Sequence, residues 1–445
     1  HSFAARSSHS VDPRASTRPL APVTTRHHSR TLYYTMSDAP AAQPPAEVEG
    51  EKKEEKKDAP PTDADKSKMD GNTKSDGAEP SEKVKERECP ENVRVWIDDC
   101  IRRLETILLN PNNTFVIHLM HMNEVIAILQ AITPIIMDEG SLAECEAPCK
   151  VVGDIHGQFV HMHMLFDMIG RVPQERMLFL GDYVDRGPHS TEVVLYLFCL
   201  KIRYPSRIFI LRGNHETPAV NKIYGFYAEL INKFGYPGIG MWYDFQAVFN
   251  RLPLAGLISK KVLCMHGGLS PELASLDTIR SIIRPCEPLD KGLLIDLLWS
   301  DPTNKGDGWF HSIRGISYMF GKQIVAQFCE KTGVDLIIRA HQVVQDGYEF
   351  MGGRKLITVF SAPNYCNQFS NAAAVVCIDQ ELKVSFQQMA VPLPAGSRAK
   401  PAPIIAADPN EPKVEPALKK DYNNNNNVAA AASPAQAAPA SPTPA

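Results

Sequence analysis

Residues 148–158 read Pro-Cys-Lys-Val-Val-Gly-Asp-Ile-His-Gly-Gln, a short apolar run that ends in glycine and polar residues. The same change recurs along the chain, and helical stretches separate most of the runs. Further apolar runs at 177–180, 208–211, 262–265, 336–338 and 356–360 lead into Gly181-Asp182, Gly213-Asn214-His215, His266-Gly267, His341 and Asn364-Tyr365, respectively. We therefore predict a layered α/β domain whose strand ends bring polar side chains to one edge, where such sheets usually carry their sites.

Sequence of a different character flanks this region on both sides. Residues 39–88 are rich in Pro, Lys and Glu and almost without aromatic residues, so burial cannot offset the entropy lost on ordering them. Beyond about residue 392 the chain turns to Pro, Ala and Asn. These patterns predict a disordered N-terminal tail over 1–90, a folded domain over 91–392 and a disordered C-terminal tail over 393–445.

The first 35 residues allow two interpretations. They are rich in Ser, Arg and His with Asp12 as their one acidic residue, which is compatible with organelle targeting. An upstream extension is the alternative, favoured because Met36 is followed by Ser37-Asp38, which resembles an ordinary start.

Whole-chain properties exclude several kinds of partner. The formal net charge of the 445 residues is −4, so no overall positive field attracts nucleic acid or a membrane surface. No apolar run approaches the roughly 18 residues that a membrane span requires. The ten cysteines are scattered without CxxC spacing, so we expect reduced thiols. We predict a cytoplasmic and/or nuclear location, with neither nucleic acid nor membrane as a partner.

Five polar clusters that follow the apolar runs are rich in metal ligands. They are Gly153-Asp154-Ile155-His156-Gly157, Gly181-Asp182-Tyr183-Val184-Asp185-Arg186-Gly187, Gly213-Asn214-His215-Glu216, His266-Gly267-Gly268 and Arg339-Ala340-His341. Carboxylate, imidazole and amide oxygen suit Zn, Fe or Mn rather than Ca, and these clusters contain no thiolate. Strand-end caps are the plain alternative, but five such clusters in succession are hard to explain as turns alone.

This donor set predicts chemistry on a phosphoryl group. A two-metal site needs a carboxylate between the ions and lowers the pKa of a bound water. Positive side chains must neutralise the phosphoryl oxygens, for which the planar fork of Arg is better suited than Lys, and Arg186 and Arg314 are the candidates. A general acid must also protonate the departing oxygen.

Six motifs together resemble the phosphoprotein phosphatase family over roughly residues 91–390. They are GDIHGQ (153–158), GDYVDRG (181–187), GNHE (213–216), HGGLSP (266–271), RAHQVV (339–344) and SAPNYC (361–366). Within the family, the stretches at 299–302 and 346–350 are most similar to protein phosphatase-1 catalytic subunits. The resemblance implies a calcineurin-like metallophosphoesterase fold, a central β-sandwich flanked by helices. It also implies that the folded domain hydrolyses phosphoserine and phosphothreonine in proteins, by direct attack of a water or hydroxide that a dinuclear metal centre activates.

The resemblance further implies a role for each site residue. Asp154 and His156 would bind the first metal, Asp182 would bridge, and Asn214, His266 and His341 would complete the second; the two divalent ions could be Mn²⁺, or Fe and Zn. His215 would be the general acid, oriented by Asp185. Arg186, Arg314 and Asn214 would hold the phosphate, with Tyr365 lining the site. The plain alternatives are a surface role for Arg314, a packing role for Tyr365, and ordinary surface or hydrogen-bonded histidines at His161, His163 and His189; Glu216 is expected to support the ligands rather than to bind metal.

Besides phosphoprotein substrates, the resemblance implies regulatory or targeting subunits. These would lay a short strand in a hydrophobic groove formed by Val262, Leu336, Phe350, Leu382, Val384 and Phe386. Ser259, Lys260 and Gln368 replace acidic residues, which should weaken the selection of basic partners. A small-molecule metallophosphoesterase and a non-catalytic scaffold are the alternative functions. The segment at 299–320 argues against the first, and the intact ligand set argues against the second.

Overall fold

The protein is seen here in a computed structural model that describes residues 88–393 and 396–402. Except at 88–90, 393 and 396–402, the predicted tails lie outside the described residues, as does the segment over 1–35. The limits predicted for the three regions therefore stay predictions.

The described chain alternates helices with short strands, as the sequence pattern predicts. Its α-helices are α1 (Glu91–Glu105), α2 (Met122–Met137), α3 (Phe159–Ile169), α4 (Ser190–Arg203), α5 (Pro218–Tyr224), α6 (Phe226–Phe234), α7 (Pro237–Phe249), α8 (Leu276–Arg280), α9 (Leu293–Trp299) and α10 (Lys322–Thr332). Its 3₁₀ helices are η1 (Thr106–Leu109), η2 (Val116–His118) and η3 (Tyr365–Asn367).

The strands form two larger sheets and one small sheet. The six-stranded sheet has the order β1 (Leu142–Cys145), β5 (Ala255–Ile258), β6 (Val262–Met265), β10 (Leu336–Arg339), β12 (Leu356–Val359), β11 (Tyr348–Met351). The five-stranded sheet has the order β14 (Val384–Met389), β13 (Ala373–Ile378), β2 (Cys149–Val152), β3 (Met177–Phe179), β4 (Ile208–Ile210). The small sheet has the order β7 (Asp301–Pro302), β9 (Tyr318–Phe320), β8 (Trp309–His311).

The two larger sheets pack face to face around one apolar core. Val151 and Leu178 of the five-stranded sheet meet Cys264, Ile338 and Ile357 of the six-stranded sheet in that core. A short run of β-branched and other apolar residues is what a strand buried on both faces requires. The predicted β-sandwich is therefore confirmed.

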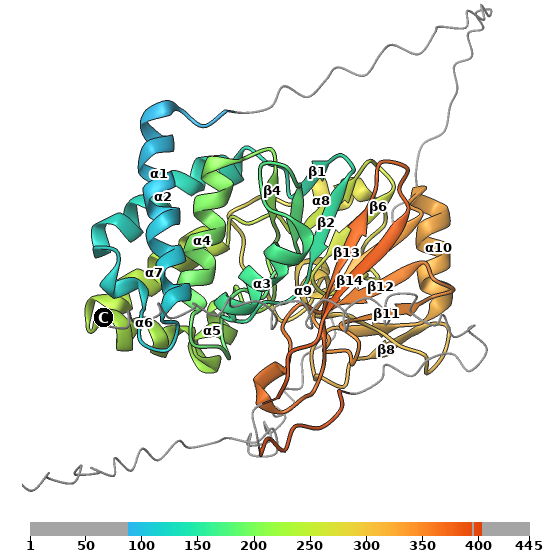
Figure 1. Ribbon diagram of the computed structural model, residues 1–445. Helices are drawn as coiled ribbons and strands as arrows, with labels where there is room; N and C mark the ends of the chain where they lie inside the picture. The colour runs from blue at the N-terminus through green and yellow to red at the C-terminus, as the bar shows by residue number, and fades with distance from the viewer. Residues whose placement is uncertain (1–87, 394–395, 403–445) are drawn as a thin grey trace, which may run out of the picture. The chain divides into compact units, whose positions relative to one another are not determined.

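Helices cover the outer face of each sheet. Helices α1, α2, α4, α6 and α7 lie on one side of the sandwich, and α10 lies on the other (Figure 1). Each group has its own apolar cluster against its sheet. Helix α4 is buried almost throughout, and its charged residues Glu192 and Lys201 are paired inside the protein. The layers are thus helix, sheet, sheet, helix.

Parallel pairing aligns the ends of the strands that matter for function. Strands β2, β3 and β4 run parallel in one sheet, and β6, β10 and β12 run parallel in the other. The carboxyl ends within each set therefore meet at one edge of its sheet, which is where the sequence places its polar clusters.

A segment near the C-terminus packs onto this body. Lys400 forms a parallel bridge with Phe369, with its N–H donating to Gln368 O at 2.7 Å and its carbonyl accepting from Ser370 N at 2.9 Å. Ala402 is buried, and its N–H donates to Oε1 of Gln345 at 2.7 Å. The contacts of the described chain thus continue past residue 392.

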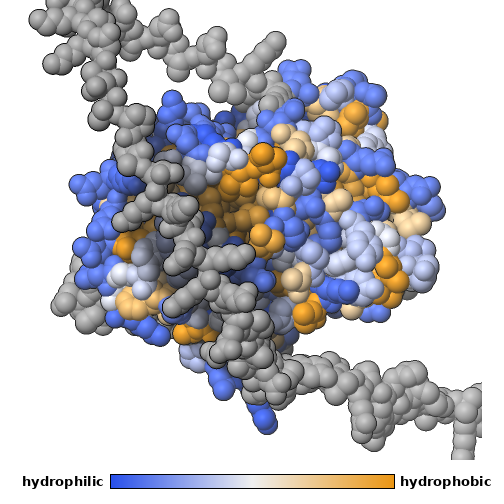
Figure 2. All heavy atoms as spheres, turned by 180° about the vertical axis from the view of Figure 1, so that it is seen from behind, coloured by the Kyte–Doolittle hydropathy of each residue, from blue (hydrophilic) through white to orange (hydrophobic). Residues whose placement is uncertain are grey.

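The surface matches the composition. On the face seen in Figure 2, hydrophilic residues make up most of the surface and apolar residues form smaller groups among them. Among the described helices, none has the length and apolar character needed to cross a membrane.

Candidate metal centre

Tight turns after the strands give the site its shape. Asp182, Asp185 and Arg186 follow β3 with φ angles of 55°, 72° and 70°, and His156 and His341 have φ angles of 47° and 68°. Residues other than glycine adopt this left-handed region only where the surrounding structure imposes it, and such residues cluster at functional sites.

Two glycines let neighbouring loops touch. A Cβ on Gly181 would lie 2.4 Å from the backbone of Gly213, and a Cβ on Gly213 would lie 2.3 Å from Oδ1 of Asp182. Only glycine fits this close approach. It brings the loop after β3 against the loop after β4, so that Asp182 reaches the Asn214-His215 pair.

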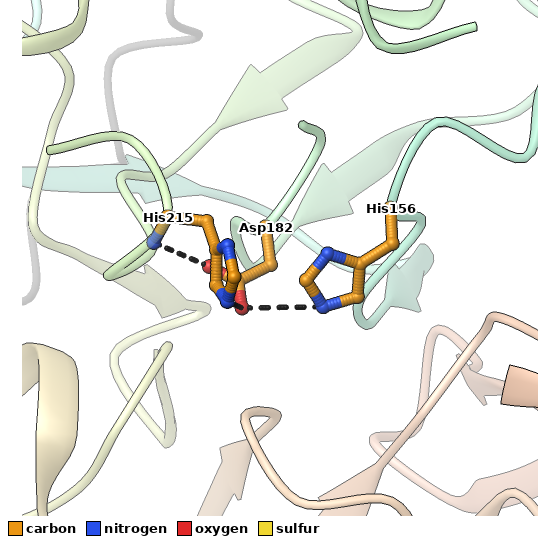
Figure 3. Close-up of side chains that lie close together, drawn as sticks. All are labelled: His156, Asp182 and His215. Carbon is orange, nitrogen blue, oxygen red and sulfur yellow. Dashed lines mark hydrogen bonds and ion pairs between the residues drawn. The ribbon is translucent and has the colours of Figure 1, made fainter. Parts of the chain in front are cut away.

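Asp182 lies at the centre of the cluster. Its Oδ2 is 3.5 Å from Nε2 of His156, and its Oδ1 is 3.3 Å from Nε2 of His266. Figure 3 shows the Asp182 carboxylate beside the ring of His215, with a dashed line that joins it to the ring of His156. The carboxylate also accepts the backbone N–H of His215 at 2.9 Å. One carboxylate therefore faces ligands on two sides, as a bridging residue must.

The remaining predicted ligands complete two groups around it. Oδ2 of Asp154 lies 3.7 Å from Nε2 of His156. The side-chain amide of Asn214 lies 2.8 Å from Nε2 of His266 and 3.0 Å from Nδ1 of His341, and these two ring nitrogens are 3.1 Å apart. All six predicted ligands are buried and converge.

Backbone carbonyls fix the histidine tautomers. Nδ1 of His156 lies 2.9 Å from Val184 O, and Nδ1 of His266 lies 3.1 Å from Leu180 O. With the proton on Nδ1, each ring turns the lone pair of Nε2 toward Asp182.

The carboxylate of Glu216 accepts the backbone N–H groups of Asp182, Tyr183 and Gly213. It thus supports the turn from behind, as predicted.

Burial and crowding change the protonation of these groups. Burial, followed by the charge of Asp182, raises the pKa of Asp154 to about 7. Burial, followed by the charge of His215, lowers the pKa of His156 to about 3. Burial also raises the pKa of Asp182, but His266 and His215 outweigh it and the net pKa lies below its usual range. Carboxylates and neutral imidazoles brought this close need positive charge between them.

The donor set fits divalent cations. Asp182, His266 and His341 form one group whose ligand atoms all lie within 4.8 Å of one another, and His156, Asp182 and His215 form another. Nδ1 is the His341 nitrogen that faces Asn214 and His266, so it is the ring atom placed to bind an ion. The centre can hold metal through carboxylate, imidazole and amide groups.

His215 is bound to a second carboxylate outside the metal cluster. Its Nδ1 lies 2.5 Å from Oδ2 of Asp185, whose Oδ1 accepts the backbone N–H of Phe226 at 2.8 Å. Burial lowers the pKa of His215, but Asp182 and Asp185 outweigh the burial and the net pKa is raised. The ring is therefore held as a proton donor with Nε2 toward the cluster.

The two arginines are held in different ways. Arg314 donates through Nε to Oδ2 of Asp301 at 2.6 Å, and its Nη2 lies 3.4 Å from His341 O, so this exposed residue holds its guanidinium beside the site. The guanidinium of Arg186 lies 4.2 Å above the ring of Tyr224 and is exposed. Oη of Tyr365 lies 3.3 Å from Nε2 of His156, so its ring borders the cluster.

Comparisons with known proteins agree with this geometry. Residues 147–345 match the calcineurin-like phosphoesterases. A Caenorhabditis elegans protein that is provisionally named a serine/threonine-protein phosphatase is 66% identical over 316 residues, which are 71% of this chain and 86% of that protein. The chain belongs to the phosphoprotein phosphatase family.

Two further relatives agree with this assignment of the phosphatase. The serine/threonine-protein phosphatase PP1-delta of Caenorhabditis elegans is 49% identical over 248 residues, 56% of this chain and 81% of that protein. A Saccharomyces cerevisiae structure, a protein serine/threonine phosphatase described as similar to human phosphatase PP5, superposes with a TM-score of 0.60. It is 34% identical and covers 66% of this chain and 98% of its own. The predicted family and fold are confirmed.

The sequence did not reveal two residues that the phosphatase uses to hold its site. Asp301 binds both Arg314 and the buried Arg339, yet nothing marked it beyond its place in the stretch at 299–302. Tyr224 comes from the end of α5 and meets Arg186 only in three dimensions.

Two of the three histidines near the motifs are buried and have one ring nitrogen without a hydrogen-bond partner among the described residues. His163 is 2% exposed; its Nδ1 lies 3.4 Å from Nη1 of Arg171, and its Nε2 is the nitrogen without a partner. It packs among Phe159, Phe166 and Tyr196, because the apolar face of α3 turns it into the core. Nδ1 of His161 lies 2.8 Å from Oε1 of Gln158; Nε2 of His189 lies 2.9 Å from Pro111 O, and Nδ1 of His189 has no hydrogen-bond partner among the described residues.

Proposed function

We propose that this phosphatase hydrolyses phosphoserine and phosphothreonine in proteins, by direct attack of a water that a dinuclear metal centre activates. The observation that carries the proposal is the convergence of six buried ligand side chains, five of them around Asp182, with His215 held beside them. Family membership supports the reaction class, and the names of the relatives support Ser and Thr as the phosphorylated residues.

The ligands divide naturally around the central carboxylate. Asp154 and His156 would hold one ion, Asn214, His266 and His341 the other, and Asp182 both. Mn²⁺, or Fe with Zn, suits these donors. When bound, the ions supply a polarised water and positive charge for the phosphoryl oxygens.

The protein supplies the proton for the departing alcohol. The hydrogen bond from Nδ1–H of His215 to Asp185 stabilises the imidazolium and aims Nε2 toward the cluster. Nε2 lies 3.9 Å from Oδ2 of Asp182, beside the proposed metal ligands. Donation of this proton lets the serine or threonine oxygen leave as a neutral hydroxyl.

Arginines orient the phosphoryl group. Arg314 is preset by the carboxylate of Asp301, so little side-chain freedom is lost when it binds phosphate. Arg186 projects from the turn after Asp185, and its charge acts on His156 and Tyr365. We propose that Arg186, Arg314 and the amide of Asn214 bind the phosphoryl oxygens and that Tyr365 closes one side.

We further propose that regulatory subunits dock on the hydrophobic groove. Val262 and Leu336 are buried and would form its floor, while the half-buried side chains of Phe350, Leu382, Val384 and Phe386 surround them. Among the described strands β14 pairs with β13 alone, so its outer edge can accept an added strand.

We also propose a cytoplasmic and/or nuclear location. All ten cysteines are free, which supports this location.

Turnover of two substrates tests the reaction. The full chain, loaded with Mn²⁺ and assayed for metal content, should release phosphate from a phosphothreonine peptide and leave bis(p-nitrophenyl) phosphate nearly untouched. Faster cleavage of the diester would point to a small-molecule phosphoesterase. Metal-loaded protein that releases phosphate from neither would refute the proposal.

A further inference from the structure

A hollow of about 720 Å³ lies directly beside the phosphate-binding arginine. Its walls come from η2, from the turn after Arg186 and from the region where α5 gives way to α6, and they include Phe115, Ile117, Arg186, Tyr224, Ala228 and Asn232. Its size lies within the range of roughly 300–1,000 Å³ that is usual for ligand sites. Apart from Arg186, no residue that lines it has a part in the proposed reaction.

The charged groups in the floor of the hollow already have partners. The ammonium of Lys233 donates to Glu192 at 2.6 Å and to Glu229 at 2.8 Å. Glu229 also accepts the backbone N–H groups of Ser190 at 3.1 Å and Thr191 at 2.7 Å. These charged groups are paired within the protein, so the floor does not select a charged ligand.

The walls offer apolar surface instead. Ile117 is 45% exposed and Tyr224 is 42% exposed, and both belong to the hollow together with Phe115 and Ala228. Apolar side chains gathered in an open concavity mark a binding surface. The chemistry that fits is a large aliphatic or aromatic group.

Tyr224 joins this hollow to the reaction site. Its ring centroid lies 5.7 Å from that of His215, and its ring carries the guanidinium of Arg186 at 4.2 Å. The N–H of Arg186 also donates to Tyr224 O at 3.4 Å. An extended peptide advances about 3.3–3.6 Å per residue, so a peptide whose phosphoryl group rests on Arg186 comes within reach of the hollow in one to three residues.

We infer that this hollow binds a large apolar side chain of the phosphoprotein, within about three residues of the phosphorylated serine or threonine. The inference rests on the proposed function and specifies its substrate. Discrimination should be substantial, because a well-filled apolar pocket changes kcat/KM by about 10- to 200-fold.

Peptides and a small substrate together test the subsite. Phosphothreonine peptides carry Ala at the three positions on each side, with Leu or Phe introduced at one position at a time. p-Nitrophenyl phosphate is too small to reach the hollow and reports the reaction alone. With full-length Mn²⁺-loaded protein, we expect one position to raise kcat/KM by about tenfold or more.

Two variants change the hollow without touching the reaction site. Ala228→Trp fills it from the exposed face of α6, and Ile117→Asp makes a wall polar. Both should abolish the preference for the apolar peptide and leave p-nitrophenyl phosphate turnover and Tm unchanged. Leu289→Asp, at a 77% exposed apolar residue that is not part of the hollow, should keep the preference.

The outcomes separate this inference from the function beneath it. Hydrolysis of the phosphopeptides with no preference at any position, or a preference that survives both variants, overturns the subsite and leaves the proposed function standing. Failure to hydrolyse p-nitrophenyl phosphate and every phosphopeptide would overturn both.

Discussion

The metal centre and the hollow beside Arg186 share a border, but their side chains are held in different ways. The ligands are buried and follow strands of two packed sheets. The walls of the hollow are partly exposed and come from η2 and from α5 and α6. Sheets fix the reacting groups closely, whereas helix ends and connections can change without moving them. The comparison assigns the reaction to the sheets and the choice of substrate to the helices.

Removing the central carboxylate should have the largest effect. Asp182→Asn keeps the shape of the side chain but removes the charge that faces both His156 and His266. We expect loss of bound metal and of turnover with every substrate, whereas Ala228→Trp keeps both. Metal analysis and p-nitrophenyl phosphate assays measure this. An Asp182→Asn protein with full metal content and activity would show that this carboxylate is not needed to bind the metal. That result would contradict the distinction drawn between the metal centre and the hollow.

The role of His215 can be distinguished from that of a ligand. We expect His215→Asn to keep its metal and to lose about 10²- to 10⁴-fold in kcat on phosphopeptides, because the general acid is gone. The loss should be smaller on p-nitrophenyl phosphate, whose leaving group needs no proton. Asp185→Asn should show the same pattern more weakly. Loss of metal from His215→Asn would instead make this residue a ligand.

The ion pairs beneath the hollow should contribute to stability rather than to reaction. Burial raises the pKa of Glu192, but His189 and Lys233 outweigh it and bring the pKa to about 2. The carboxylate therefore stabilises the fold above its ordinary pKa of 4.5, and this stabilisation is lost as the pH falls from 4.5 toward 2. We expect Glu192→Gln to lower the free energy of unfolding by about 3 kcal/mol at pH 7.

Urea unfolding of the wild type and of Glu192→Gln, at pH 7 and again at pH 4, measures how much Glu192 contributes to the free energy of unfolding and whether this contribution falls at lower pH. The difference in free energy of unfolding between the two proteins should begin to narrow at the lower pH. The kcat of Glu192→Gln on p-nitrophenyl phosphate, at pH 7 and low temperature, should stay close to that of the wild type. A gap that widens toward pH 4 would contradict the assignment of a charged, paired Glu192.

Replacing each of the two phosphate-binding arginines, Arg186 and Arg314, with Lys should have a smaller effect on activity than the changes at Asp182 and His215. Arg314 is clamped by Asp301, and its fork geometry is lost in Arg314→Lys, so we expect kcat/KM on phosphopeptides to fall by about tenfold or more. Arg186→Lys keeps a charge that can still lie on Tyr224, so its loss should be less. Equal losses of kcat/KM in the two variants would show that the pairing of Arg314 with Asp301 has no catalytic consequence.

The sequence predicted the centre better than its surroundings. Asp154, Asp182 and His266 follow apolar runs, and a ligand next to its strand has a position that the chain order gives directly. Asp301 holds Arg314, which lies 13 positions further along the chain, and Tyr224 meets Arg186 from the end of α5, so only packing could reveal them. His163 lies in the core because a polar residue on an apolar helix face follows that face inward.

The bridge between Lys400 and Phe369 bears on how this enzyme can be shortened. A chain cut at residue 392 would match the limits that composition suggests, but it would lose the segment that binds the loop between Tyr365 and Ser370. It would also leave Oε1 of Gln345 without the N–H of Ala402, and Gln345 lies only four residues after His341. A minimal phosphatase should therefore keep residues through 402, because a shorter one loosens the wall beside its own active site.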